Sequence, residues 1–205
     1  MVTRPAGLVL VLAIVAWTAC SDLRIGEQLY TVTTTVMLGD CESASSSPCR
    51  KPGQLPVACF ATPLPYPPIG CGGVDVKGLD PSSVPGSVTY SNGVVATKTL
   101  TLVGTWTGDA LFLTDGAQIA KDTDHTSLPE CHQTPADGEG GITPQMRAVI
   151  NDGKVLRAHH IQVLEFGMCQ GAVFLVVAVA TPDTVDFLTK RYAPARVAGW
   201  LRPLN

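Results

Sequence analysis

The sequence has few charged residues and no cluster of basic ones. Charged side chains make up 15% of the chain and the formal net charge is −3, whereas soluble domains average about 25% charged residues. Binding to nucleic-acid phosphates needs a concentrated basic surface, so the composition excludes a nucleic-acid partner. Because glycine, proline, threonine and valine are frequent, we expect strands and loops to outweigh helices.

The sequence also lacks a long hydrophobic run. Its first apolar stretch, Gly7 to Ala19, has about 13 residues, fewer than the roughly 18 that span a bilayer core as a helix. The stretch follows Arg4 and ends in small residues before Cys20, an order typical of a secretory signal. We therefore predict a signal peptide at 1–19 and a short tether at 20–26.

Seven cysteines are present, and their number bears on how the signal is cleaved. Thr18-Ala19-Cys20 resembles a bacterial lipobox, although Trp17 stands where that motif usually has leucine. Cleavage before a lipidated Cys20 would leave an even set, enough for three disulfides, whereas ordinary secretion after Ala19 would leave an odd thiol. We predict a diacylglycerol anchor with an added acyl chain, such as palmitate, on Cys20. The predicted disulfide cysteines are Cys41, Cys49, Cys59, Cys71, Cys131 and Cys169.

Residues 27–116 carry the patterns of strands. Residues 28–38 alternate apolar and hydroxyl side chains, which is typical of a strand with one wet face. Residues 55–60 are interpreted as a short edge strand because of Pro56, and 74–79 as a further strand. Residues 94–114 fit a hairpin. These strands predict a small antiparallel barrel of the OB type. Cys41 and Cys49 either bond to each other across their loop or pair elsewhere.

The remaining chain predicts a small α+β unit. Residues 117–141 are polar and are interpreted as a linker loop that holds Cys131, which is expected to bond to Cys169. In 142–205, Thr143-Pro144 favours a capped helix start. Strands at 155–166 and 171–180, a helix at 185–192 capped by Thr181 or Asp183, and a strand at 196–201 would follow. The fold class is therefore α+β and β-rich, with a barrel followed by an αββαβ unit.

Three segments resemble a pattern found in uncharacterised bacterial secreted proteins and lipoproteins. They are Cys59 with Tyr66-Pro67-Pro68-Ile69-Gly70-Cys71-Gly72-Gly73 and Val76-Lys77-Gly78-Leu79-Asp80, then 102–109, and finally Thr181-Pro182-Asp183 with Arg191-Tyr192-Ala193-Pro194 and Leu201-Arg202-Pro203. The resemblance covers about half of the mature chain. It implies an envelope protein with an OB-like front half and a Cys59–Cys71 disulfide, and it implies no activity. Ala193, in place of glycine, departs from the pattern, and Cys41 and Cys49 look like additions to it.

Residues that could carry catalysis or bind a metal have plainer interpretations. His159 and His160 are adjacent in a predicted strand and would face opposite sides, so they cannot share a metal. Asp183 and Asp186 lie in the first turn of a predicted helix, where carboxylates are favoured by the helix dipole. Neither a Gly-x-Ser-x-Gly nor a Ser-x-x-Lys/Lys-Thr-Gly arrangement occurs in the sequence. The loop set His125, Cys131 and His132, with Asp122, Asp124 and Glu130, would lose its thiolate to a disulfide.

We therefore expect a non-catalytic lipoprotein of the cell envelope, monomeric and without metal or cofactor. Its front half would bind a small ligand, a glycan or a protein partner, with Tyr66, Pro67, Pro68 and Trp106 as the candidate binding loop. One alternative is a secreted hydrolase that uses scattered carboxylates. Another is a scaffold or inhibitor in which the proline-rich loop, held by a disulfide, contacts a partner.

Overall fold

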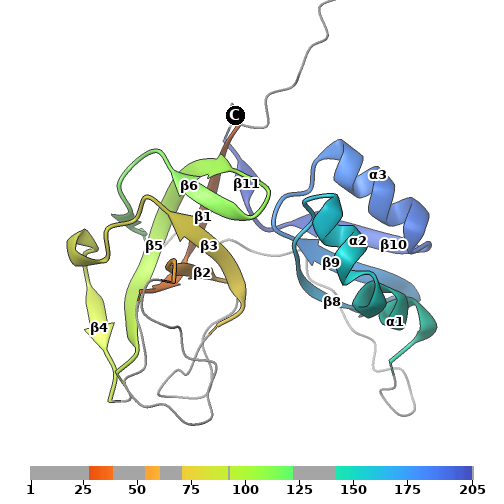
Figure 1. The fold of residues 1–205 in the computed structure, drawn as a ribbon, viewed down its shortest axis with the longest axis horizontal. Helices are drawn as coiled ribbons and strands as arrows, with labels where there is room; N and C mark the ends of the chain where they lie inside the picture. The colour runs from red at the N-terminus through yellow and green to blue at the C-terminus, as the bar shows by residue number, and fades with distance from the viewer. Residues whose placement is uncertain (1–27, 39–53, 61–70, 92, 122–141, 205) are drawn as a thin grey trace, which may run out of the picture.

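The computed structural model describes residues 28–38, 54–60, 71–91, 93–121 and 142–204. They form two sheets that lie on opposite sides of the molecule in Figure 1, with three helices beside the second sheet. The elements are β1 (Leu29–Met37), β2 (Val57–Cys59), β3 (Gly73–Lys77), η1 (Pro81–Ser83), β4 (Ser87–Thr89), β5 (Val95–Trp106), β6 (Ala110–Leu113), β7 (Gln118–Ile119), α1 (Pro144–Asn151), α2 (Gly153–Ala158), β8 (Val163–Cys169), β9 (Ala172–Val177), α3 (Pro182–Arg191), β10 (Ala195–Gly199) and β11 (Arg202–Pro203). The β-rich α+β class is confirmed.

The first sheet, called the front sheet here, is organised around β1. This strand pairs with β5 from Leu29↔Thr105 to Met37↔Ala96, and on its other edge it pairs with β11 and then with β2. Strand β2 pairs with β3, β3 with β6, and β6 with β5, so the pairings return to β1. All of these pairs are antiparallel except β3–β6, which is parallel.

The alternation in β1 and β5 determines the two faces of the front sheet. Val32 and Val36 are at most 1% exposed and point into the core together with Thr34, which is buried and donates to the Cys59 carbonyl, while Thr33 and Thr35 point to the other side. In β5, Leu100 and Leu102 are fully buried and alternate with Thr99 and Thr101. Period-two patterning thus places one apolar and one hydroxyl-bearing face on the same two strands, as the sequence predicts.

Two expectations about this half are corrected. Strand β2 is internal and not an edge, because β1 pairs with one side of it and β3 with the other. Pro56 is accommodated because it precedes the strand and uses only its carbonyl, which accepts from the Val76 amide at 2.8 Å. Strand β7 lies at the start of the predicted linker and pairs with β5. Residues 122–141 of that linker lie outside the described residues.

The second sheet, the back sheet, consists of β8, β9 and β10. Strand β8 is antiparallel to β9, and β10 is parallel to β9, with α3 as the crossover. Thr143 caps α1 by accepting from the Met146 amide at 3.2 Å, and Thr181 caps α3 by accepting from the Thr184 amide at 3.1 Å. Both caps are followed by proline at the first helical position, which confirms the predicted start of α1. Of the two caps predicted for the later helix, Thr181 is the one observed, and α3 begins at Pro182 and not at Val185.

The strand predicted at 155–166 is wrong in its first half. Residues 153–158 form α2, and the strand starts only at Val163. Leu156 of α2 and Val149 of α1 are both buried in the core between the helices and the back sheet, together with Leu175 and Leu188. His159 caps α2 and His160 has a φ of 56°, so the two histidines stand at a helix end and not in a strand.

One core joins the two sheets. Val176, Ala178, Trp200 and Leu201 of the second half belong to the same buried cluster as the inward side chains of the front sheet. The Trp200 ring meets the Phe60 ring edge-on at 5.6 Å, and the Gln162 side-chain amide donates to the Gly73 carbonyl at 2.8 Å. The two halves therefore pack as one body. Among the described residues, no helix has the length and apolarity to cross a membrane.

Candidate binding surfaces

The structure describes only some of the residues that the sequence nominates. Cys59 is bonded to Cys71, as predicted, and Cys169 is disulfide-bonded. Twelve further nominated residues lie outside the described residues: Cys20, Cys41, Cys49, Tyr66, Pro67, Pro68, Asp122, Asp124, His125, Glu130, Cys131 and His132.

The Cys59–Cys71 bond closes the corner between β2 and β3. The two Cα atoms are 5.4 Å apart and the residues are separated by 12 positions. Both cysteines pack in a small cluster with Met37, Val94 and Ala96 on the outer side of the front sheet. The bond therefore fixes both ends of the segment that contains the Tyr-Pro-Pro sequence.

Trp106 is buried at the end of β5. Only 7% of its surface is exposed, and it packs in the core that joins the two sheets. The next three residues form the predicted hairpin turn, in which the Thr107 amide donates to the Ala110 carbonyl at 3.0 Å. A side chain this buried offers almost no area to a ligand, so its role is in the core.

The outer side of β1 and β5 carries an array of hydroxyl groups. We call this array the threonine face and define it as Thr31, Thr33, Thr35, Thr99, Thr101 and Thr105. Thr33 is paired with Thr101 and Thr35 with Thr99, and the hydroxyls of Thr33 and Thr101 are 3.3 Å apart. The array exists because two alternating strands are paired along most of their length; in the same rows, Thr31 lies opposite Val103 and Thr105 opposite Leu29.

A large apolar side chain stands at one end of the threonine face. Phe112 of β6 is 49% exposed and is paired with Thr105 on one side and Lys77 on the other. Lys77 contacts Asp109 at 3.5 Å. The Thr107 hydroxyl donates to Asp109 and, with Lys77 nearby, lowers the pKa of that carboxyl. Phe112 was not nominated from the sequence, although an outward phenylalanine between two inward leucines is the pattern that could have identified it.

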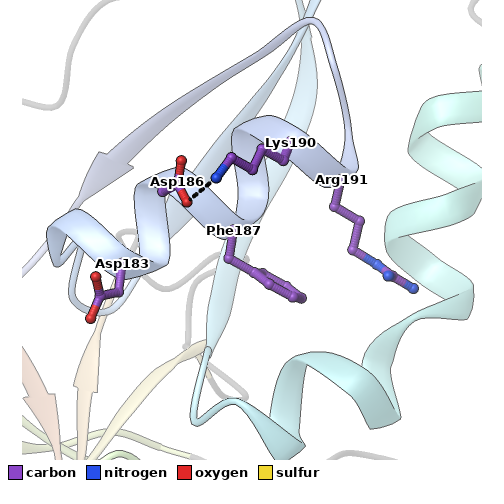
Figure 2. A pocket seen from close by; sticks show the side chains of 5 residues that line it. All are labelled: Asp183, Asp186, Phe187, Lys190 and Arg191. Atoms are coloured by element: carbon purple, nitrogen blue, oxygen red, sulfur yellow. Dashed lines mark hydrogen bonds and ion pairs between the residues drawn. The ribbon is translucent and has the colours of Figure 1, made fainter.

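A shallow depression of about 370 Å³ lies on α3. Its lining residues are Asp183, Asp186, Phe187, Lys190 and Arg191. Figure 2 shows Asp186 and Lys190 paired along the helix, with Phe187 and Arg191 extending towards the neighbouring helices. The Lys190 ammonium lies 2.6 Å from the Asp186 carboxylate, and the Phe187 ring lies 4.3 Å from the His159 ring, between centroids.

A hydrogen-bonded group of three side chains, Asp152, Arg191 and Tyr192, adjoins this depression. Arg191 Nε and the Tyr192 hydroxyl both donate to one oxygen of Asp152, at 2.6 and 2.9 Å. The hydrogen bond from Arg191 holds the pKa of Asp152 below its usual range. Burial, aided by the bond to Asp152, raises the pKa of Tyr192 to about 12. These hydrogen bonds connect the C-terminal end of α3 to the junction of α1 and α2, so we interpret the three side chains as structural.

The two described histidines are consecutive in the chain but contact different parts of the molecule. His159 stacks on Phe187, whereas His160 lies against the hairpin turn of the front sheet, where a Cβ added to Gly108 would come within 3.0 Å of its Nδ1. Among the described residues, no group of three or more histidine, cysteine or acidic side chains is arranged to hold a metal ion. The prediction that Asp183 and Asp186 share the first turn is right for Asp183 only, because α3 begins at Pro182 and Asp186 lies one turn further on, where it pairs with Lys190.

Comparisons with known proteins return no relative. No family model, no curated protein and no solved structure matches this chain.

Proposed function

We propose that this chain is a binding protein of the bacterial cell envelope, anchored through a lipid on Cys20, and that its front sheet is the binding half. The observation that carries the proposal is the threonine face with the half-exposed Phe112 at its end. The face places several partly exposed hydroxyl groups beside an exposed aromatic ring, so it can offer a ligand both hydrogen bonds and an apolar contact.

We further propose that the front sheet is a barrel of the OB type. Support comes from the ring of pairings through β1, β2, β3, β6 and β5, with a single parallel pair between β3 and β6. OB barrels bind ligands on an outer sheet face. Here the outer side of β2 is taken up by the disulfide cluster, which leaves the side formed by β1, β5 and β6 for a ligand.

A non-catalytic role is supported by the state of the described carboxylates near the candidate surfaces. Asp152 accepts from Arg191 and Tyr192, Asp109 from Thr107 and Lys77, and Asp186 from Lys190. The hydrogen bonds from Arg191 and Thr107 lower the pKa of Asp152 and Asp109 respectively, whereas a general acid needs a raised pKa.

An oxidising compartment is supported by the disulfide-bonded state of Cys59, Cys71 and Cys169, and the lipid anchor is proposed from the sequence Thr18-Ala19-Cys20. The test is the intact mass of the protein purified from its own envelope, before and after reduction. A mature start at Cys20 with added lipid and a gain of six protons on reduction is the expected result. A lipid-free mass with an unpaired thiol would refute the anchor.

A second function is favoured by one observation, the Cys59–Cys71 bond at the base of the segment that contains Tyr66. A disulfide there pre-organises the segment for a protein partner, as in a scaffold or inhibitor. Substituting Tyr66 and Pro67 by alanine should then abolish capture of that partner without a change in melting temperature. Retained capture would exclude this role.

A further inference from the structure

We infer that the ligand of the threonine face is a neutral glycan chain, with one sugar ring resting on Phe112. This inference rests on the binding function proposed above and names its ligand class.

Phe112 provides the apolar part of the site. It lies in a row that crosses four strands, Leu29, Thr105, Phe112 and Lys77, and neighbouring strands are about 4.8 Å apart. A sugar ring has an apolar side of C–H groups and a rim of hydroxyls. Phe112 can contact the apolar side of a sugar ring while hydroxyl groups on the neighbouring strands bond to the sugar's hydroxyls.

The threonines provide the polar part. Each hydroxyl has one donor and two acceptor positions, so it pairs with sugar hydroxyls in either direction. The hydroxyls of Thr33 and Thr101 lie 3.3 Å apart across the two strands. From Thr99 to Thr105 the face extends about 20 Å along β5, enough for several linked sugar rings.

The distribution of charge favours a neutral polymer over an anionic one. No charged residue of β1, β5 or β6 lies between the threonines and Phe112. The nearest charged residues in sequence, Lys98 and Asp109, lie just beyond the ends of the array. Of the basic residues at its borders, Lys77 contacts Asp109, and Arg202 of β11 pairs beside Thr31. A polyanion would need several cations at once, whereas a neutral glycan needs none.

The test is a binding assay on the full mature protein with defined probes. These are dextran, laminarin, mannan, galactan and arabinan as neutral glycans, with heparin and oligo-dT as anionic ones. We expect at least one neutral glycan to bind, with little change in affinity between 0.1 and 0.5 M salt, since no ion pairs form.

The variants locate the site. Phe112→Ala should weaken binding at least tenfold, and Phe112→Tyr, which keeps the ring, should retain it. Ile150→Ala removes a side chain of matched exposure, 51%, from α1 in the other half and should leave affinity unchanged. The double change Thr33→Ala/Thr101→Ala should weaken binding several-fold. An unchanged melting temperature for Phe112→Ala shows that the variant is folded.

Three outcomes would overturn the inference. They are no binding to any neutral glycan, binding to heparin or oligo-dT alone, and glycan binding that Phe112→Ala leaves intact. If a protein ligand then protects β1, β5 and β6 from hydrogen exchange, the binding function stands and only the glycan fails. Turnover of a substrate by the purified protein would instead refute the binding function itself.

Discussion

The front and back sheets contain the same kinds of apolar residue, but the front strands are buried on one side and the central back strand on both. In the front sheet, β1 and β5 bury one side and expose a hydroxyl-bearing other side. In the back sheet, β9 is buried on both sides, by helices on one and by the front sheet on the other. A strand with one wet face is available for a ligand, and a strand covered twice is not. The difference assigns binding to the front half and support to the back half.

The largest expected effect comes from breaking the core that both sheets share. Trp200→Ala should lower the free energy of unfolding by about 3–5 kcal/mol, because it removes a buried ring that packs on Phe60. Urea unfolding followed by circular dichroism and by Trp106 fluorescence should show one shared transition that moves to lower urea. Two separate transitions would mean that the halves are stable independently.

The disulfide is expected to matter less, and for the front half only. Replacing Cys59 and Cys71 together by serine should cost about 3 kcal/mol, as for a loop of this length. Melting curves of the variant, compared with the parent protein, give the measurement. Hydrogen exchange should increase in β2 and β3 and remain the same in α3; equal increases in both halves would contradict a local effect.

A smaller effect tests the contact that holds α3. Tyr192→Phe removes a hydrogen bond to Asp152 and should cost about 1 kcal/mol at neutral pH. Because the folded pKa of Tyr192 is raised to about 12 from an ordinary 10.0, its contribution is present below pH 10 and is lost as pH rises towards 12. Stability measured from pH 8 to 12 should therefore fall less steeply in the variant than in the parent protein. Parallel curves would exclude Tyr192 as the cause.

The smallest effect concerns the surface pair on α3. Asp186→Asn should change stability by about 0.3–0.5 kcal/mol, since Lys190 and Asp186 are both well exposed and four residues apart. The measurement is the urea midpoint at low and high salt, and the small difference should vanish at high salt. A cost above about 1 kcal/mol would contradict the small contribution expected of an exposed ion pair.

The predictions from sequence succeeded where a local pattern determines the structure. The alternation of 28–38 gave β1, the Thr-Pro starts gave the caps of α1 and α3, and the turn at 107–109 gave the β5–β6 hairpin. Each of these signals depends only on neighbours in the chain, so the sequence carries it directly.

The failures arise where distant contacts decide. Strands β4 and β7 are two or three exposed residues long and exist because β5 is there to pair with them. Helix α2 was mistaken for a strand because the spacing of its apolar residues fits both a strand and a helix. In the structure it is a helix whose Leu156 packs in the same core as Val149 of α1. Phe112 was missed because its neighbours in the sheet, Thr105 and Lys77, belong to strands distant in the sequence, although its alternation with two leucines indicates that it faces outward.

The short strand β11 carries the chain from the back sheet to the edge of β1. The Leu204 amide donates to the Leu29 carbonyl at 2.9 Å, and the Gln28 side chain donates to the Leu204 carbonyl at 3.0 Å. Figure 1 shows this strand between the two halves, so the back unit is inserted between two strands of the front sheet. A circular permutant that joins residue 204 to residue 28 by a short linker and opens the turn at Gly171 should therefore keep the same fold.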